Sequence, residues 1–229
     1  MHICHTARIN LKFNSINIMN ENIKIKSTVK SIGYIIDQDL NMKQQISETV
    51  KKSNFALHCI SKIRQFLNNN STQILINALV ISKLEYNLEL LYNIKQKDVQ
   101  KLEKVLRKSV RLIFNLKKRD SVKEYMKTLK WLPIAERIKM KNIKVIHNSI
   151  CYQEPQYIRD LFELNDNPQT RQNNGHNLKI PITLSEFHKQ ALSIYGPALY
   201  NQIPIDIRRS NNFKDRLKEY YTEKNFEDS

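Results

Sequence analysis

The sequence predicts a mainly α fold of the α+β kind, in which small N-terminal antiparallel strands precede a helical bundle and a less regular helical C-terminal region. Only three glycines and six prolines occur in 229 residues, and this scarcity favours long helices over a fold with many turns. Apolar residues alternate with polar ones between residues 8 and 36, then recur at helical spacing from residue 42 to about residue 152. With 41% hydrophobic residues, a chain of this length can bury a substantial core in one or two domains.

The N-terminal region has the two-residue period that is typical of β-strands. Its apolar positions are Ile9, Leu11, Phe13, Ile16, Ile18, Ile23, Ile25, Val29, Ile32 and Ile35. Asp37 and Asp39 follow, where a strand ends and a helix is about to begin. A close pair of carboxylates can hold divalent ions in polymerases and nucleases. Aspartates at such a position commonly accept hydrogen bonds from backbone amides instead, and we favour that capping role.

Helical periodicity predicts most of the remaining elements. The first expected helix runs from about Met42 to Leu67, and the second from a cap at Ser71 or Thr72 to about Tyr92. A third helix, which carries the basic residues, begins at about Gln96, and a shorter fourth helix begins near Ser121. A fifth helix covers Ile134–Ile150, with Pro133 where a first-turn proline belongs. Residues 164–178 are polar and rich in helix breakers, which predicts a loop. A short extended piece over Leu178–Ile182 and two short helices, around Ser193–Asn201 and Asn211–Lys224, complete the chain.

The cysteines and histidines do not predict a metal or catalytic site. Cys4 lies beside His2 and His5, and ligands this close together do not readily face one metal ion. Cys59 and Cys151 fall on apolar-periodic helices, where we expect them to pack as small hydrophobic residues. The sequence also has no glycine-rich phosphate loop, no nucleophile elbow and no HExxH motif.

The N-terminal segment MHICHTARINLKF lacks the apolar stretch of a signal peptide, and no stretch of about 18 residues is free of charge. Three cysteines without an evident pairing fit a reducing compartment. We therefore expect an intracellular protein, of the nucleus or the cytoplasm, that does not enter a membrane.

Positive charge is concentrated in one part of the chain. Seventeen lysines and arginines fall between Lys95 and Lys144 against five acids, and this surplus of +12 (17 minus 5) is most of the formal net charge of +16. Spacings of four, three, four and three residues place five of the cations on one narrow helix face: Lys97, Lys101, Lys104, Lys108 and Arg111. The opposite half of that helix is apolar, with Val99, Leu102, Val105, Leu106, Val110, Leu112, Ile113 and Leu116.

Two interpretations of this cationic face are open, a solvated helix surface and a binding surface for phosphates. Solvated faces usually mix Glu with Lys for pairing along the helix, whereas this stripe contains no acid. The excess also continues past the helix through Lys117, Lys118, Arg119 and Lys123. On the later helix, Arg137, Lys141 and Lys144 again share a face, opposite Ile138, Val145, Ile146 and Ile150. These features favour phosphate binding.

A family resemblance extends over roughly residues 28–221. It is carried by VKSIGYIIDQDLNMKQQISETVKKS, with Ile32, Gly33, Asp37 and Leu40, and by ALVISKLEY (Ala78–Tyr86), KLEKVLRKSVRLIF (Lys101–Phe114), LKWLPIAERIKMK (Leu129–Lys141), PQYIRDLF (Pro155–Phe162), SIYGPALYNQIPIDIR (Ser193–Arg208) and FKDRLKEYY (Phe213–Tyr221). In this order, the segments resemble the region after the catalytic palm of non-LTR (LINE-type, jockey-like) retrotransposon reverse transcriptases. The strongest match is the Trp-Leu-Pro segment at Leu129–Lys141.

The chain departs from the family pattern in a few positions and in one large feature. Tyr200 stands where the family usually has Trp, Ile203 where it has Leu, and Lys130 where it has His. The family's catalytic aspartates, including an Ala-Asp-Asp sequence, lie upstream of the matching region, and this sequence contains no Asp-Asp. The resemblance therefore implies no catalytic residue and no metal ligand here. Mg²⁺ would belong to the missing palm, and we do not expect this chain alone to polymerise.

The resemblance also implies a domain order. Residues 1–41 would be a β-rich remnant of the palm edge, 42–117 a thumb-like three-helix bundle, 118–163 a helical extension with the Trp-Leu-Pro segment, 164–182 a polar loop with a short extended piece, and 183–229 the C-terminal short helices. A thumb holds the template–primer duplex by its backbone and so does not read sequence. Trp131 could stack on a base, although beside Leu132 and Pro133 it is more often a packing anchor.

The sequence thus predicts a reverse-transcriptase fragment that binds RNA or RNA–DNA duplex through phosphates, with the missing palm as a further partner. The residues expected to bind are Lys97, Lys101, Lys104, Lys108, Arg111, Lys117, Lys118, Arg119, Arg137, Lys141 and Lys144. Two alternatives remain open. The chain could be a non-catalytic helical module for protein interaction, or a decayed transposable-element relic without function.

Overall fold

The computed structural model describes residues 15–24, 26–165, 177–183 and 188–226. The described residues are mainly helical, with two small antiparallel strand pairs at the N-terminal end, as the sequence predicted. They divide into two compact units. The first unit holds the described residues up to Asn87 together with Ile94–Val122, and the second holds Leu88–Asn93 and the described residues from Lys123 onward.

The first unit begins with two β-hairpins. Strand β1 (Ser15–Ile18) pairs with β2 (Glu21–Lys24), and β3 (Thr28–Ser31) pairs with β4 (Tyr34–Asp37). Both hairpins turn through two residues of positive φ, as type I′ turns require. The predicted strand positions Ile9, Leu11, Phe13 and Ile25 lie outside the described residues.

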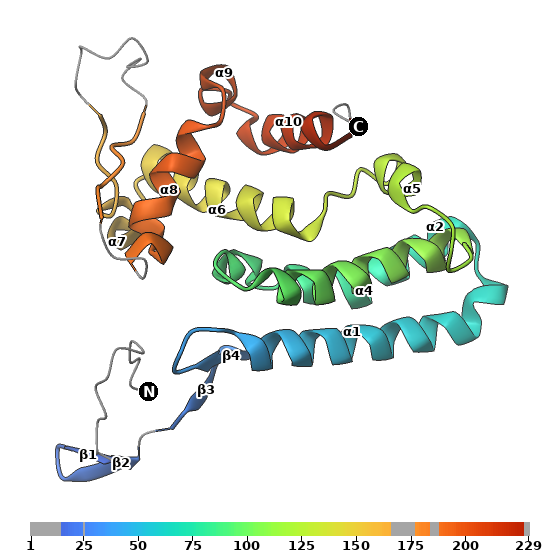
Figure 1. Cartoon of the computed structure of the whole chain (residues 1–229), viewed down its shortest axis with the longest axis horizontal. Helices are drawn as coiled ribbons and strands as arrows, with labels where there is room; N and C mark the ends of the chain where they lie inside the picture. The colour runs from blue at the N-terminus through green and yellow to red at the C-terminus, as the bar shows by residue number, and fades with distance from the viewer. Residues whose placement is uncertain (1–14, 25, 166–176, 184–187, 227–229) are drawn as a thin grey trace. The chain divides into compact units, whose positions relative to one another are not determined.

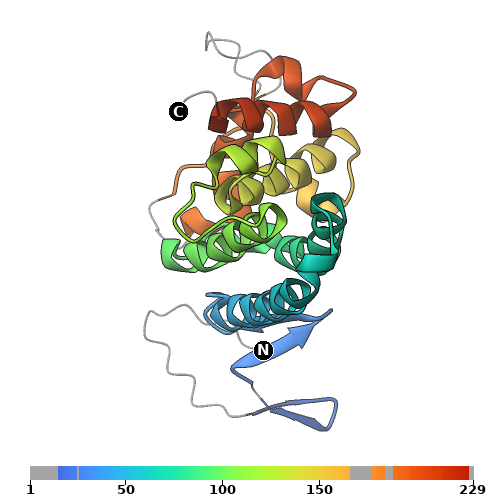
Figure 2. The ribbon, with the colours of Figure 1, turned by 90° about the vertical axis from the view of Figure 1, so that its right-hand side faces the viewer.

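The helices of the first unit follow these hairpins in the chain and pack against one another. They are α1 (Lys43–Ile63) with its 3-10 extension η1 (Arg64–Phe66), α2 (Asn69–Ile76), a π-helical segment η2 (Asn77–Ile81), α3 (Ser82–Glu85) and α4 (Gln96–Phe114). Helices α1 and α4 lie side by side, and α2 also packs on α4 (Figures 1 and 2). The buried faces supply Ile46, Leu57, Ile60, Ile76, Leu102, Leu106 and Val110 to the core.

Two details of this region differ from the sequence prediction. The cap of α2 is Asn68, whose Oδ1 accepts a hydrogen bond from the Ser71 amide at 2.8 Å, and not Ser71 or Thr72. The helix expected to reach Tyr92 ends at Glu85, because Tyr86 is extended and Asn87 has a positive φ of 49°. A separate 3-10 turn, η3 (Leu88–Leu91), follows and belongs to the second unit.

The second unit is built around helix α6 (Ile134–Cys151), which matches the predicted helix Ile134–Ile150. The other helices are α5 (Lys123–Thr128), α7 (Gln156–Arg159), η4 (His188–Gln190), α8 (Leu192–Asn201), α9 (Ile205–Arg208) and α10 (Phe213–Phe226). Helices α8 and α10 both pack on α6 (Figure 1). Their shared core contains Leu132, Ile143, Ile146, Leu199, Ile203, Phe213 and Leu217.

The short extended piece predicted at Leu178–Ile182 forms a single isolated β-bridge and not a longer strand. Leu178 makes an isolated antiparallel bridge with Leu164, and the Leu178 amide and carbonyl are both bonded to the Asn201 side chain, at 2.9 and 2.8 Å. Of the loop predicted over residues 164–178, residues 166–176 lie outside the described part. The side-chain amide of Asn201 thus bonds to the backbone of Leu178 as a second neighbouring strand would, while Leu164 forms the β-bridge.

Candidate nucleic-acid interface

Helix α4 has the two-sided character that its residue spacing predicts. Five apolar residues of the predicted back are buried: Leu102, Val105, Leu106, Val110 and Ile113. The front is polar, and Lys97, Lys101, Lys104 and Lys108 are all exposed on it. Since the buried face packs on α1 and α2, the lysines lie outside this packed face, with Lys108 at its border with α1.

Two of these lysines are held by neighbours. The Lys101 Nζ lies 2.6 Å from the Asp98 Oδ1, and Asp98 is only 1% exposed. The Lys108 Nζ donates to the Asn54 Oδ1 of α1 at 3.0 Å. Lys97 and Lys104 have no acidic partner among the described residues. Asp98, one of the five acids counted in the sequence, lies in the first turn of α4 and compensates the charge of Lys101, a pairing that the sequence prediction did not include.

Arg111 marks the end of the cationic face. It is half-buried, its Nη2 donates to the Asp120 carbonyl at 3.3 Å, and its Nε is buried without a hydrogen-bond partner in the described structure. Asn115 then takes the left-handed conformation that commonly closes a helix. The chain turns there, so that Lys117, Lys118 and Arg119 are exposed in the loop beyond the helix.

The face predicted on α6 is not formed. Arg137, which we expected to bind phosphate, is 6% exposed, and its Nε donates to the Leu132 carbonyl at 2.8 Å. Lys141 is 30% exposed and lies 4.0 Å from the Glu89 carboxylate, and Lys144 is half-buried. The helical spacing was right, but the turn before α6 and segment η3 cover this side of the helix.

Trp131 lies in the same turn and is buried. Its ring centroid is 5.6 Å from the Arg137 Cζ, a distance at which a cation is attracted to the ring face. The indole is therefore occupied in packing, as the position beside Leu132 and Pro133 suggested, and it is not presented for stacking on a base.

The carboxylates at the end of β4 organise a turn. The Asp37 Oδ1 accepts hydrogen bonds from the amides of Asn41 and Asp39, at 2.9 and 3.2 Å. These amides belong to the turn before α1, whose own N-cap, Met42, makes no side-chain capping bond. Within the described ranges, no three His, Cys, Asp or Glu side chains are grouped closely enough to hold a metal ion. Cys4, His2 and His5 lie outside these ranges.

Two cysteines differ from expectation, since Cys59 and Cys151 are exposed rather than packed in a core. The Cys151 Sγ lies 3.8 Å from the His147 Nδ1, on the same face of α6. Partial burial raises the pKa of the Cys151 thiol, and burial lowers the pKa of His147 from 6.5 to about 4. Both groups are therefore neutral near pH 7, and this pair lacks the thiolate that a nucleophile requires.

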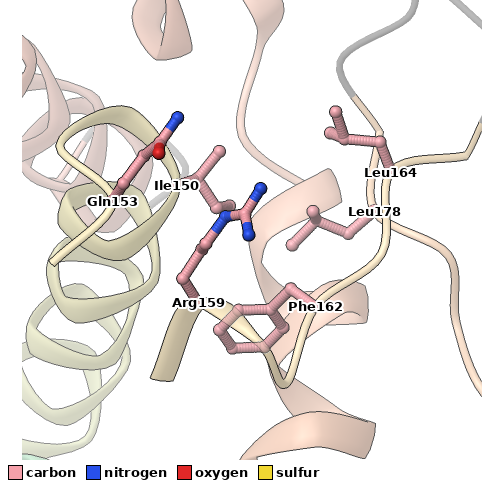
Figure 3. A pocket seen from close by; sticks show the side chains of 6 residues that line it. All are labelled: Ile150, Gln153, Arg159, Phe162, Leu164 and Leu178. Carbon is pink, nitrogen blue, oxygen red and sulfur yellow. The ribbon is translucent and has the colours of Figure 1, made fainter. Parts of the chain in front are cut away.

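A small hollow lies in the second unit, between α6, α7 and the Leu164–Leu178 bridge (Figure 3). It is lined by Ile150, Gln153, Arg159, Phe162, Leu164 and Leu178 and has a volume of about 250 Å³. This volume is below the range of about 300–1,000 Å³ that is typical of sites for small molecules. Arg159 also lies 3.5 Å from the Asp160 carboxylate. The exposed cations of α4 therefore form the better candidate site.

No protein-family model, no curated protein and no solved structure matches this chain. No helix in the described part is both long enough and apolar enough to span a bilayer.

Proposed function

We propose that the chain binds RNA or RNA–DNA duplex through backbone phosphates without reading base sequence, as a thumb-like part of a retrotransposon reverse transcriptase. The observation that carries this proposal is the cationic face of α4, with Lys97, Lys101, Lys104 and Lys108 exposed over a buried apolar back. The resemblance of the surrounding segments to the region after the palm supports it. In this role the chain holds the duplex by its backbone, and the catalytic carboxylates and their Mg²⁺ belong to the palm.

The length of the face suits a nucleic-acid backbone. Fourteen residues separate Lys97 from Arg111, which at about 1.5 Å per residue is about 21 Å along the helix. That distance corresponds to about six nucleotide steps of one strand at about 3.4 Å each. A lysine face supplies point charges without a base-reading fork, which is consistent with sequence-independent binding.

Salt dependence of duplex binding tests the proposal. In the triple variant K97E/K104E/K108E, we expect weaker binding to short RNA–DNA duplexes of any sequence. The slope of log affinity against log salt should flatten by about 0.9 per lost phosphate contact. Lys101 is left unchanged, because a glutamate there would face the buried Asp98 carboxylate.

A matched control carries the same change of charge away from α4. Lys30, Lys83 and Lys218 are exposed on other elements, and the variant K30E/K83E/K218E should keep most of the wild-type slope. Equal losses in the two triple variants would show that only net charge matters. Binding unaffected by K97E/K104E/K108E would refute the proposal.

A further inference from the structure

The outer side of α1 and of its 3-10 extension η1 carries a second exposed surface, which the sequence prediction did not single out. Lysines and aromatic rings follow one another there at spacings of four, three, four and four residues. The members of this lysine–phenylalanine ridge are Lys51, Phe55, His58, Lys62 and Phe66. All five are exposed, Phe55 by 70% and Phe66 by 79%.

The packing of the first unit does not require Phe55 and Phe66 to be exposed to solvent. The inner side of α1 already fills its place in the core with Ile46, Leu57 and Ile60, which are buried. Phenylalanine is among the residues most often buried, and a contiguous exposed apolar surface commonly marks an interaction site. Ile63, 45% exposed, adjoins the ridge.

We propose that this ridge binds single-stranded RNA or DNA, with bases stacked on Phe55 and Phe66 and phosphates held by Lys51 and Lys62. Charge complementarity argues for this occupant. Neither lysine has an acidic partner among the described residues, whereas the neighbouring Lys52 is paired with Glu48 at 3.8 Å. A second copy of a chain with a net charge of +16 would bring like charges together across the ridge.

The dimensions of the ridge fit a short strand. From Phe55 to the end of α1 at Ile63 the helix rises about 1.5 Å per residue, and over the three residues of η1 about 2.0 Å each, which gives about 18 Å. This length accommodates about five nucleotides at about 3.4 Å each. Proteins that bind single strands combine such stacking rings with cations, and their sites cover about 4–16 nucleotides. Every base has a π face, so this mode of binding is also independent of sequence.

The ridge is distinct from the cationic face of α4 and extends the function beyond duplex binding. The only aromatic residue on α4 is Phe114, which is half-buried at its end, so that face has no exposed ring to stack on. The two surfaces adjoin within the first unit, because Lys108 bonds to Asn54, the residue before Phe55. A single strand on the ridge could therefore continue from a duplex on α4.

Fluorescence anisotropy with two labelled probes tests the proposal in the full chain. The probes are a uridine homopolymer of about ten nucleotides, which has no duplex, and a blunt RNA–DNA duplex. In the variant F55L/F66L we expect the affinity for the homopolymer to fall at least about tenfold, and the affinity for the duplex to stay within about twofold. The salt slope for the homopolymer should not change, because the lysines remain. F55W/F66W should restore or strengthen binding.

Leucine keeps the apolar surface and the helix, so a folding defect is not expected, and circular dichroism checks this. Removal of an exposed apolar side chain from α2 in I74A serves as the control and should leave both probes unaffected. Unchanged homopolymer affinity in F55L/F66L overturns the proposal.

Sedimentation velocity tests the alternative occupant of the ridge. A wild-type dimer that competes with the homopolymer for the ridge would assign this face to a second copy of the chain. Duplex binding lost in K97E/K104E/K108E but kept in F55L/F66L separates the two surfaces.

Discussion

At the scale of single residues, His147 shows how the second unit holds a titratable group inside its core. The imidazole is 6% exposed, stacks on Phe213 with ring centroids 3.5 Å apart, and has its Nδ1 3.1 Å from the Tyr200 hydroxyl. Burial lowers the pKa of His147 to about 4 and raises the pKa of Tyr200 to about 12. The groups that face the imidazole, Tyr200 and Cys151, therefore stay neutral between pH 4 and 7.

This depressed pKa predicts a loss of stability in mild acid. The unfolded chain takes up a proton at His147 near pH 6.5, but the folded chain does so only near pH 4, so stability falls as pH drops through this window. We expect a loss of about 1–3 kcal/mol at pH 4 relative to pH 7 from this residue alone. In H147F, which keeps an aromatic ring against Phe213, the loss should disappear from the urea-unfolding free energy.

A second prediction at this scale separates two neighbouring lysines of α4. Lys101 is compensated by Asp98 at 2.6 Å, whereas Lys104 has no acidic partner in the described structure. K104A should therefore flatten the salt slope of duplex binding by about 0.9, and K101A by clearly less. Isothermal titrations across a range of salt concentrations measure both slopes. Equal effects would mean that the ion pair opens when the duplex binds.

At the scale of elements, Arg64 ties the end of α4 to the end of α1. Its Nε donates to the Leu112 carbonyl and its Nη2 to the Ile113 carbonyl, both at 2.8 Å, while Nη1 donates to the Leu67 carbonyl at 2.6 Å. The last carbonyls of a helix lack partners within the helix, and a cation there also opposes the negative end of the helix dipole. One guanidinium thus caps α4 and closes the turn after α1.

We predict that R64K destabilises the protein by about 1–3 kcal/mol, because an ammonium group cannot supply the planar fork that reaches several carbonyls. R64M, which keeps the aliphatic stem and removes the charge, should cost at least as much. Urea denaturation followed by circular dichroism measures both. Arg107, whose pair with Glu103 is at the surface of α4, provides the control, and R107K should change stability by less than about 0.5 kcal/mol.

Helical periodicity predicted α1, α4 and α6 well, because it depends only on which residues share a face. It could not predict what covers a face. Arg137 has the same spacing relative to Lys141 as Lys97 has to Lys101, but a carbonyl of the preceding turn reaches Arg137 and none reaches Lys97 in the described structure. The sequence analysis did not single out Phe55, whose exposure depends on where α4 packs against α1. Asn68 was visible in the sequence as a cap and was overlooked beside Ser71.

At the scale of the whole molecule, the division into two units has consequences for stability. Leu106 of α4 lies in the core of the first unit and Leu217 of α10 in that of the second, and both are fully buried. Replacing either by Ala removes about 2–5 kcal/mol of stability from its own core. Because distant substitutions without shared partners act independently, each change should be felt within its own unit.

Hydrogen exchange resolved by peptide tests this independence. In L217A we expect faster exchange in α6, α8 and α10, which pack together, and unchanged exchange in α1 and α4. L106A should show the reverse pattern. Each variant is the control for the other, since both remove the same atoms from a helix. Faster exchange throughout the chain in either variant would mean that the protein opens as one cooperative body. In that case, a loss of duplex binding in any destabilised variant could not be assigned to the face of α4.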